Sequence, residues 1–260
     1  MDDSLAALVR QHDPDRFLTV LFAPPAKRDA LLALYAFNHE LARAREVASE
    51  PTLALIRLQW WREVVEGAVR HHVVATPLHA AIEAGLLSRA DLLAVIEARE
   101  IEAEPGIGTL ADWRAYVLAG AGGLAVAAAR ALNAPDPEAL RPLGAAYGVA
   151  GLLRSWRLLA AQGRCLLPVD LLAAQGLSME GAIAEPESSQ VQAVLARLAD
   201  EGRAMLRQGA QATVRGATIA AALPAVLAQR DLARWPRQAP LHRGVGDRLA
   251  VAVAGMRGRL

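Results

Sequence analysis

Hydrophobic and polar positions in this chain are spaced like the faces of helices. Pro24-Pro25 and Pro51 mark two helix starts, because proline is well accommodated in the first turn of a helix. Ser88 with Asp91, and Thr109 with Asp112, resemble capping boxes. The pattern predicts helices over 27–47, 51–70, 92–101, 113–132, 137–162, 169–175, 190–208 and 217–233, with a last helix after Val245.

The chain lacks the period of two that half-buried strands show. Gly, Ser and Glu around Pro186 indicate a loop over 176–189, and Pro224 is expected to kink its helix. We therefore expect an all-α protein. Its single domain should span 1–235, followed by a basic C-terminal segment, 236–260, that contains the final helix.

Composition supports a large helical core. Of the 260 residues 54% are hydrophobic and only 4% aromatic, and mean hydropathy is +0.23. The uncharged stretches 115–129 and 216–229 are too short to span a bilayer and are expected to be buried. Cys165 is the only cysteine and Met1-Asp2-Asp3 is acidic, so we expect neither a disulfide nor a secretory signal. These features predict a cytoplasmic protein.

Charge is unevenly distributed along the chain. Residues 201–260 hold ten Lys and Arg against three Asp and Glu, a net +7, whereas residues 1–200 hold 18 against 24, a net −6. A basic tail can contact a membrane surface or an acidic partner, or be a solvated helix face. We expect peripheral contact with a membrane surface through this segment and no nucleic-acid partner.

Common catalytic motifs are absent. His39-Glu40 is followed by Arg43 where a zinc protease needs a second histidine, and no GxSxG, P-loop or GxGxxG motif occurs. Adjacent His71-His72 lie on different helix faces, which does not suit a metal site. Gly120 to Gly123 lie in an apolar helix, where small residues are expected to permit close helix packing.

Three ordered segments resemble the squalene/phytoene synthase family of head-to-head prenyl transferases. The first runs from Phe22 through Pro24-Pro25 to Tyr35-Ala36-Phe37. The second joins 93–102 to Thr109 through Tyr116 and Ala119-Gly120. The third extends from Leu143-Gly144 through Arg154 to Gly163-Arg164, Leu167-Pro168 and Asp170. The resemblance covers about 17–177 and implies an isoprenoid-synthase-like helical bundle around a central cavity.

In that family, aspartate-rich helices hold Mg²⁺ against substrate diphosphate, because bridging cations require hard oxygen ligands. Here the first motif reads Ala42-Arg43-Ala44-Arg45-Glu46. The second falls on Gly151, Arg154, Ser155 and Leu159, and the whole stretch 139–169 contains no acidic residue. The usual magnesium site is therefore not expected.

A closer resemblance links the chain to the phytoene-synthase-like branch that includes a mitochondrial complex I assembly factor. It rests on the segment from Tyr35 to Ala42, with Asn38-His39-Glu40, and on the helix around Gln59-Trp60-Trp61. That branch also has degraded aspartate motifs. The resemblance implies support of respiratory NADH dehydrogenase assembly, with a respiratory-complex subunit or assembly protein as partner.

Two functions remain open. One is a non-catalytic protein that binds a partner, a membrane surface, or an apolar ligand such as a polyprenyl diphosphate, without a cofactor. The other is a prenyl transferase with a reduced Mg²⁺ site. The resemblance and the residue types nominate a set of cavity residues: Tyr35, Asn38, Arg43, Glu46, Tyr116, Arg154 and Arg164.

Glu97, Glu100 and Glu102 are candidates for a residual cation site, although a solvated acidic face would look the same. Arginines can also bind phosphate without metal through bidentate contacts. The set considered is Arg43, Arg45, Arg154, Arg157 and Arg164. The alternative is that Arg43 and Arg45 face solvent or pair with Glu40 and Glu46. Trp60, Trp61 and Trp113 are expected in the core or in cavity walls.

Overall fold

The computed structural model describes residues 3–46, 48, 50–212, 214–236 and 243–258. Over these ranges the chain is helical and contains no β-strand, which confirms the all-α prediction. The α-helices are α1 (Asp3–His12), α2 (Pro14–Val20), α3 (Pro25–Glu46), α4 (Pro51–Glu66), α5 (Ala75–Glu83), α6 (Arg89–Glu100), α7 (Leu110–Val117), α8 (Gly123–Ala131), α9 (Arg141–Ala161), α10 (Val169–Ala174), α11 (Met179–Ala184), α12 (Ser189–Gly209), α13 (Ile219–Ala222), α14 (Pro224–Arg234) and α15 (Val245–Arg257).

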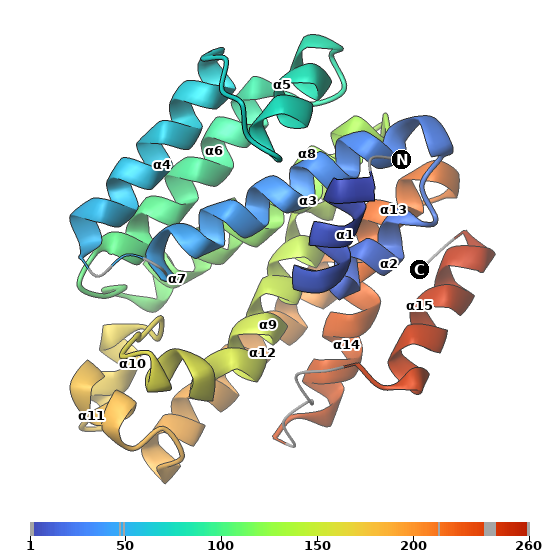
Figure 1. Cartoon of the computed structure of the whole chain (residues 1–260). Helices are drawn as coiled ribbons and strands as arrows, with labels where there is room; N and C mark the ends of the chain where they lie inside the picture. The colour runs from blue at the N-terminus through green and yellow to red at the C-terminus, as the bar shows by residue number, and fades with distance from the viewer. Residues whose placement is uncertain (1–2, 47, 49, 213, 237–242, 259–260) are drawn as a thin grey trace.

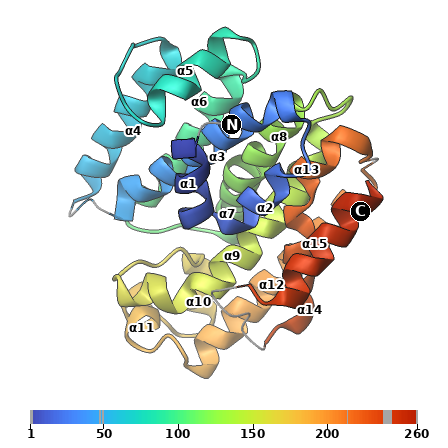
Figure 2. The same ribbon diagram turned by 45° about the vertical axis from the view of Figure 1, so that its right-hand side comes forward.

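Two long helices organise the bundle (Figure 1). The helix α9 packs against α8, α12 and α14, and α3 packs against α1, α4, α5 and α8. In both views α4 and α15 lie at opposite edges of the molecule (Figure 2). Trp113 and Trp156 are fully buried in the core, which includes side chains from most of the helices.

Most expected helices are present, with boundaries set by local chemistry. Thr109 and Asp112 form a reciprocal capping box at the start of α7, and the side chain of Ser88 accepts from the Asp91 amide at the start of α6. The helix expected to reach residue 70 ends at Glu66, because Gly67 takes a φ of 124°, a conformation that glycine adopts readily.

Other expectations were wrong in detail. The predicted single helix 113–132 is interrupted by the π-turn η2 (Leu118–Gly122), and the predicted loop 176–189 contains α11, capped by Ser178. The start at Pro137 is the short 3-10 turn η3 (Glu138–Leu140), ahead of α9. A new helix begins at Pro224, after η4 (Gly216–Thr218) and α13. No helix in the described ranges has the length and apolarity to cross a membrane.

Close packing around η2 explains its glycines. A Cβ on Gly144 of α9 would lie 2.6 Å from the carbonyl oxygen of Ala121, and one on Gly148 would lie 2.5 Å from the Ala121 Cβ. A Cβ on Gly122 would lie 2.8 Å from the Arg141 carbonyl oxygen. The predicted close approach of helices at this glycine-rich segment is therefore confirmed.

Candidate functional site

The bundle encloses a cavity of about 230 Å³ bordered by α3, α7, η2 and α9. On α3, Asn38, Ala42 and Glu46 are spaced four residues apart and share the face that lines it. On α9 the lining side chains are mostly small or apolar: Tyr147, Gly148, Gly151, Leu152, Ser155 and Leu159. The cavity thus has a mixed wall on α3 and a largely apolar wall on α9.

A buried carboxylate, Glu102, is the centre of the polar part of this cavity. It lies in η1 (Ile101–Ala103), directly after α6, and only 7% of the residue is exposed. Its Oε1 accepts from Arg99 Nη1 at 2.6 Å and from the Tyr116 hydroxyl at 2.7 Å. Its Oε2 accepts from Arg164 Nη2 at 2.9 Å. Both oxygens are therefore occupied by neighbouring side chains.

Arg99 extends this cluster to α3. Its Nη2 donates to Asn38 Oδ1 at 3.1 Å, while its buried Nε has no hydrogen-bond partner among the described residues. Two guanidinium groups, Arg99 and Arg164, therefore share one carboxylate. The wall they form carries an excess positive charge, since two cations face the single anion Glu102.

The cluster fixes the protonation of its members. Burial alone raises the pKa of Glu102, but Arg99, the Tyr116 hydrogen bond and Arg164 outweigh it, so the pKa lies below its usual value. Burial and the adjacent carboxylate raise the pKa of Tyr116. At neutral pH Glu102 is ionised and Tyr116 is a neutral hydrogen-bond donor.

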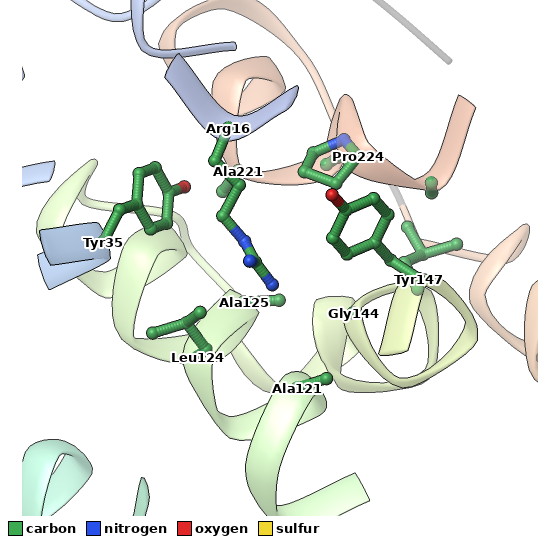
Figure 3. Close-up of a pocket in the computed structure, with 12 residues that line it drawn as sticks. Arg16, Tyr35, Ala121, Leu124, Ala125, Gly144, Tyr147, Ala221 and Pro224 are labelled. Carbon is green, nitrogen blue, oxygen red and sulfur yellow. The ribbon is translucent and has the colours of Figure 1, made fainter. Parts of the chain in front are cut away.

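Beside the main cavity lies a small hollow built around Arg16 (Figure 3). The Arg16 guanidinium lies 5.6 Å from the centre of the Tyr35 ring and 4.8 Å from that of Tyr147, within the range of cation–π contact. Arg16 also pairs with Asp13 at 2.7 Å. Burial raises the pKa of Tyr35 to about 12, although Arg16 opposes the shift.

The structure brings together part of the predicted set. Asn38, Glu46, Tyr116 and Arg164 line the central cavity, and Tyr35 lines the adjoining hollow. Arg16 and Arg99 also line the cavity but were not among the predicted site residues, although Arg99 lies in the segment 93–102 that resembles the family. Only the tertiary fold places them there, since they come from α2 and α6.

Arg43 and Arg154 do not line this cavity, contrary to the expectation. Arg43 is exposed and its Nη1 lies 3.5 Å from Glu40 on the same helix. Arg154 lies on a different face of α9 from Ser155 and pairs with Asp231 at 3.3 Å and Asp15 at 3.6 Å. Both side chains are therefore occupied by neighbouring carboxylates outside the cavity.

The wider arginine set is dispersed. Arg45 donates to the carbonyl oxygen of Ala48 at 3.2 Å, and Arg157 pairs with Glu187 at 3.1 Å. Of the five arginines considered, Arg164 alone lines the cavity. The pairing of Arg43 with Glu40 agrees with the alternative interpretation of a solvated helix face.

The three glutamates considered as a cation site lie in different surroundings. Glu97 is exposed, Glu100 pairs with Arg62 at 2.6 Å, and Glu102 belongs to the buried cluster. In the described part of the chain, no three His, Cys, Asp or Glu side chains come together in a way that could hold a metal ion. Trp61 and Trp113 are buried as expected, and Trp60 packs edge-on against Trp61.

The chain matches a known protein family over most of its length. Residues 9–245 match the family described as squalene/phytoene synthase. The chain belongs to the squalene/phytoene synthase family. This match covers all of the cavity described above.

Curated relatives in the family carry a different kind of name. The human protein named "NADH dehydrogenase (ubiquinone) complex I, assembly factor 6" is 26% identical over 208 residues, 77% of this chain and 62% of its own length. A homologue of that factor from Drosophila melanogaster is 28% identical over 189 residues, 67% of this chain and 56% of its own length. The chain therefore spans less than two thirds of these relatives.

Solved structures support the fold. A dehydrosqualene synthase superposes with a TM-score of 0.76 at 15% identity, covering 97% of this chain and 94% of the enzyme. A squalene synthase from Alicyclobacillus acidocaldarius gives a TM-score of 0.69 at 18% identity, with coverages of 98% and 92%. The predicted isoprenoid-synthase-like fold is thus confirmed.

The two aspartate-rich positions of the squalene/phytoene synthase family now have a place in space. Ala42 and Glu46 line the cavity from α3, and Gly151, Ser155 and Leu159 line it from α9. The positions that align with the family's two aspartate-rich motifs therefore lie on two walls of one cavity. Glu46 is the single carboxylate among these five residues.

These residues do not fit the magnesium cluster that the family implies. Mg²⁺ is held by several oxygen ligands in octahedral geometry, usually including carboxylates. The second carboxylate of the cavity, Glu102, already accepts from three side chains. Arg16, Arg99 and Arg164 on the same walls would repel a divalent cation.

Proposed function

We propose that this protein is a squalene/phytoene synthase family member that works by binding and supports the assembly of respiratory complex I. One observation supports the first half most strongly. The cavity positions that correspond to the family's aspartates hold Ala42, Gly151, Ser155 and Leu159, with Glu46 as the remaining carboxylate. Such walls offer one carboxylate for bridging diphosphate through magnesium, whereas they can enclose an apolar ligand or stabilise a scaffold.

The assembly role rests on the curated relatives, whose names refer to NADH dehydrogenase complex I assembly. The partner in this proposal is a respiratory-complex subunit or another assembly protein. The place of action is the inner membrane, where the protein would be peripheral and exposed to the cytoplasm. A polyprenyl diphosphate or another apolar molecule is the proposed ligand class for the cavity.

The alternative is a prenyl transferase of the squalene/phytoene type with a reduced Mg²⁺ site. The retained fold and Glu46 on the cavity wall favour it. It would need at least one further metal ligand, and the other carboxylate that lines the cavity, Glu102, already accepts from three side chains. Binding is therefore the better supported function.

The proposal is tested in cells that lack the protein. Assembled complex I is measured on native gels, and NADH:quinone oxidoreductase activity is measured in membranes. Both are expected to fall and to recover when the wild-type chain is returned. Full levels of assembled, active complex I in the deletion strain would contradict the assembly role.

A further inference from the structure

The last helix, α15, exposes an apolar stripe. Val245 is 83% exposed, Leu249 59% and Met256 74%, and these residues recur at spacings that place them along one side of the helix. Beside the stripe, a groove of about 470 Å³ is lined by Leu249, Val253 and Ala254, together with arginines. Apolar side chains this exposed on one helix mark a contact surface.

The helix is held firmly against the bundle on its other side. Asp247, 3% exposed, accepts from Arg230 Nε at 2.6 Å and from Arg234 Nη2 at 2.7 Å. Val251 is fully buried, and Gly255 packs so closely on Phe22 that a Cβ there would lie 2.4 Å from the ring. The exposed stripe is therefore a fixed feature of a docked helix.

Residues 201–260 expose no acidic side chain in the part of the chain that the structure describes. Asp13 and Asp15 line a hollow that Arg248 also borders, and each of the two is paired with an arginine. The three acidic residues of 201–260 are Glu201, Asp231 and Asp247, and each is 7% exposed or less. All three are paired with arginines inside the bundle. Their charge is thus withdrawn from the surface.

Unpaired arginines remain on that surface. Arg215, Arg248 and Arg257 are exposed, and none of them forms an ion pair with a described residue. The Gly216 amide donates to the carbonyl oxygen of Gly258 at 3.3 Å, which places Arg215 beside the end of α15. An apolar stripe flanked by free cations on one exposed helix matches the interface of an anionic lipid bilayer.

A second apolar face, on α4, lacks this combination. Leu53 and Ile56 are 44% and 59% exposed there, but Glu63 and Arg70 pair with each other, as do Arg62 and Glu100. Its surface is therefore close to charge balance. It also lies at the opposite edge of the molecule from α15 in both views (Figures 1 and 2).

We propose that α15, with its Val245–Leu249–Met256 stripe and Arg215, Arg248 and Arg257, lies flat on an anionic phospholipid surface. The apolar stripe enters the boundary between headgroups and acyl chains, and the arginines contact lipid phosphates. This inference rests on the peripheral membrane location proposed above and assigns the surface responsible for it.

The test is co-sedimentation of the purified full-length chain with vesicles. Binding is expected to phosphatidylcholine vesicles containing phosphatidylglycerol, to weaken with added salt, and to be absent with phosphatidylcholine alone. Changing Arg248→Gln with Arg257→Gln should reduce partitioning roughly 25-fold, because each surface cation contributes about fivefold. Leu249→Ser should reduce it roughly tenfold.

Matched controls are available on α4. Ile56 has the same exposed fraction as Leu249, 59%, and Arg57 is an exposed cation. Ile56→Ser and Arg57→Gln should bind vesicles like the wild type, and circular dichroism should show all variants equally folded. Wild-type binding by the folded α15 variants would overturn the inference.

No binding to anionic vesicles at low salt would also overturn the lipid-binding inference. In that case the surface of α15 would be expected to contact an acidic protein surface instead. The assay uses only protein and lipid, so its outcome is independent of complex I. A protein that binds vesicles through α15 but is dispensable for complex I would retain this inference and contradict the assembly role.

Discussion

At the scale of single residues, Glu102 holds the polar side of the cavity together. Its carboxylate compensates Arg99 and Arg164 in an environment where an unpaired charge is costly. Because these side chains come from η1, α6 and the turn after α9, the cluster also joins separate parts of the chain.

Changing Glu102→Gln should destabilise the fold by roughly 3–5 kcal/mol, since it leaves two buried guanidinium groups without their anion. Urea unfolding followed by circular dichroism measures this. Glu97→Gln, an exposed glutamate in the same region, is the control and should change the free energy of unfolding by less than about 0.5 kcal/mol.

The difference in the free energy of unfolding between wild type and Glu102→Gln should also depend on pH. The pKa of Glu102 is lowered in the folded state, so its stabilisation is complete above the unfolded-state pKa of about 4.3 and is lost as pH falls through the folded-state value. The difference between wild type and Glu102→Gln should therefore shrink on acidification. An equal loss for Glu97→Gln and Glu102→Gln would contradict the role assigned to the cluster.

Some predicted site residues lie on the cavity wall and others do not. Asn38, Tyr116 and Arg164 lie in segments that resemble the family, and they line the cavity. Arg16 lies outside these segments and could not be found, because its place depends on how α2 packs. Arg99 lies in the segment 93–102, but nothing in the sequence distinguished it from its neighbours. Arg154 was misplaced, because Asp15 and Asp231, distant in sequence, draw it to another side of α9.

At the scale of elements, α9 packs closely against η2 and α8 because glycines at the contact have no side chain. Gly144 and Gly148 allow the backbones to approach, whereas Gly151, one turn further along α9, has nothing within 4 Å of its would-be Cβ. On one helix, Gly144 and Gly148 are therefore tightly packed, whereas Gly151 faces open space.

Gly144→Ala should destabilise the protein by roughly 1–3 kcal/mol, because its Cβ would press on the Ala121 carbonyl oxygen. Gly151→Ala should stabilise it by roughly 0.5–1 kcal/mol, since alanine favours a helix and the space is open. Thermal unfolding of both variants measures the difference. Similar effects of the same sign would show that the α9–η2 contact is looser than described.

Capping residues were predictable at Thr109 and Ser88, although the helices begin at Leu110 and Arg89, three residues before the predicted starts at 113 and 92. The predicted boundaries were wrong where tertiary packing outweighs local helix propensity. The π-turn within 113–132 fits the glycine-rich segment against α9, and α11 forms where polar composition alone indicated a loop. The short helices α1 and α2 were not anticipated, although α2 supplies Asp15 and Arg16.

At the scale of the whole molecule, buried ion pairs join the two ends of the chain. Arg243, 5% exposed in its side chain, contacts Asp15 of α2 at 2.9 Å and Asp231 of α14 at 2.6 Å. Arg243, just before α15, therefore links α2 to α14. The fold of a prenyl transferase is kept intact while the carboxylates of its cavity are not.

The proposed function by binding predicts a protein that does not transfer prenyl groups. Purified protein is incubated with farnesyl and geranylgeranyl diphosphate, with and without Mg²⁺, while diphosphate release and apolar product are followed beside an active synthase of the family. We expect no release above the protein-free background in either condition. Release that depends on Mg²⁺ would contradict this prediction and support the prenyl transferase alternative.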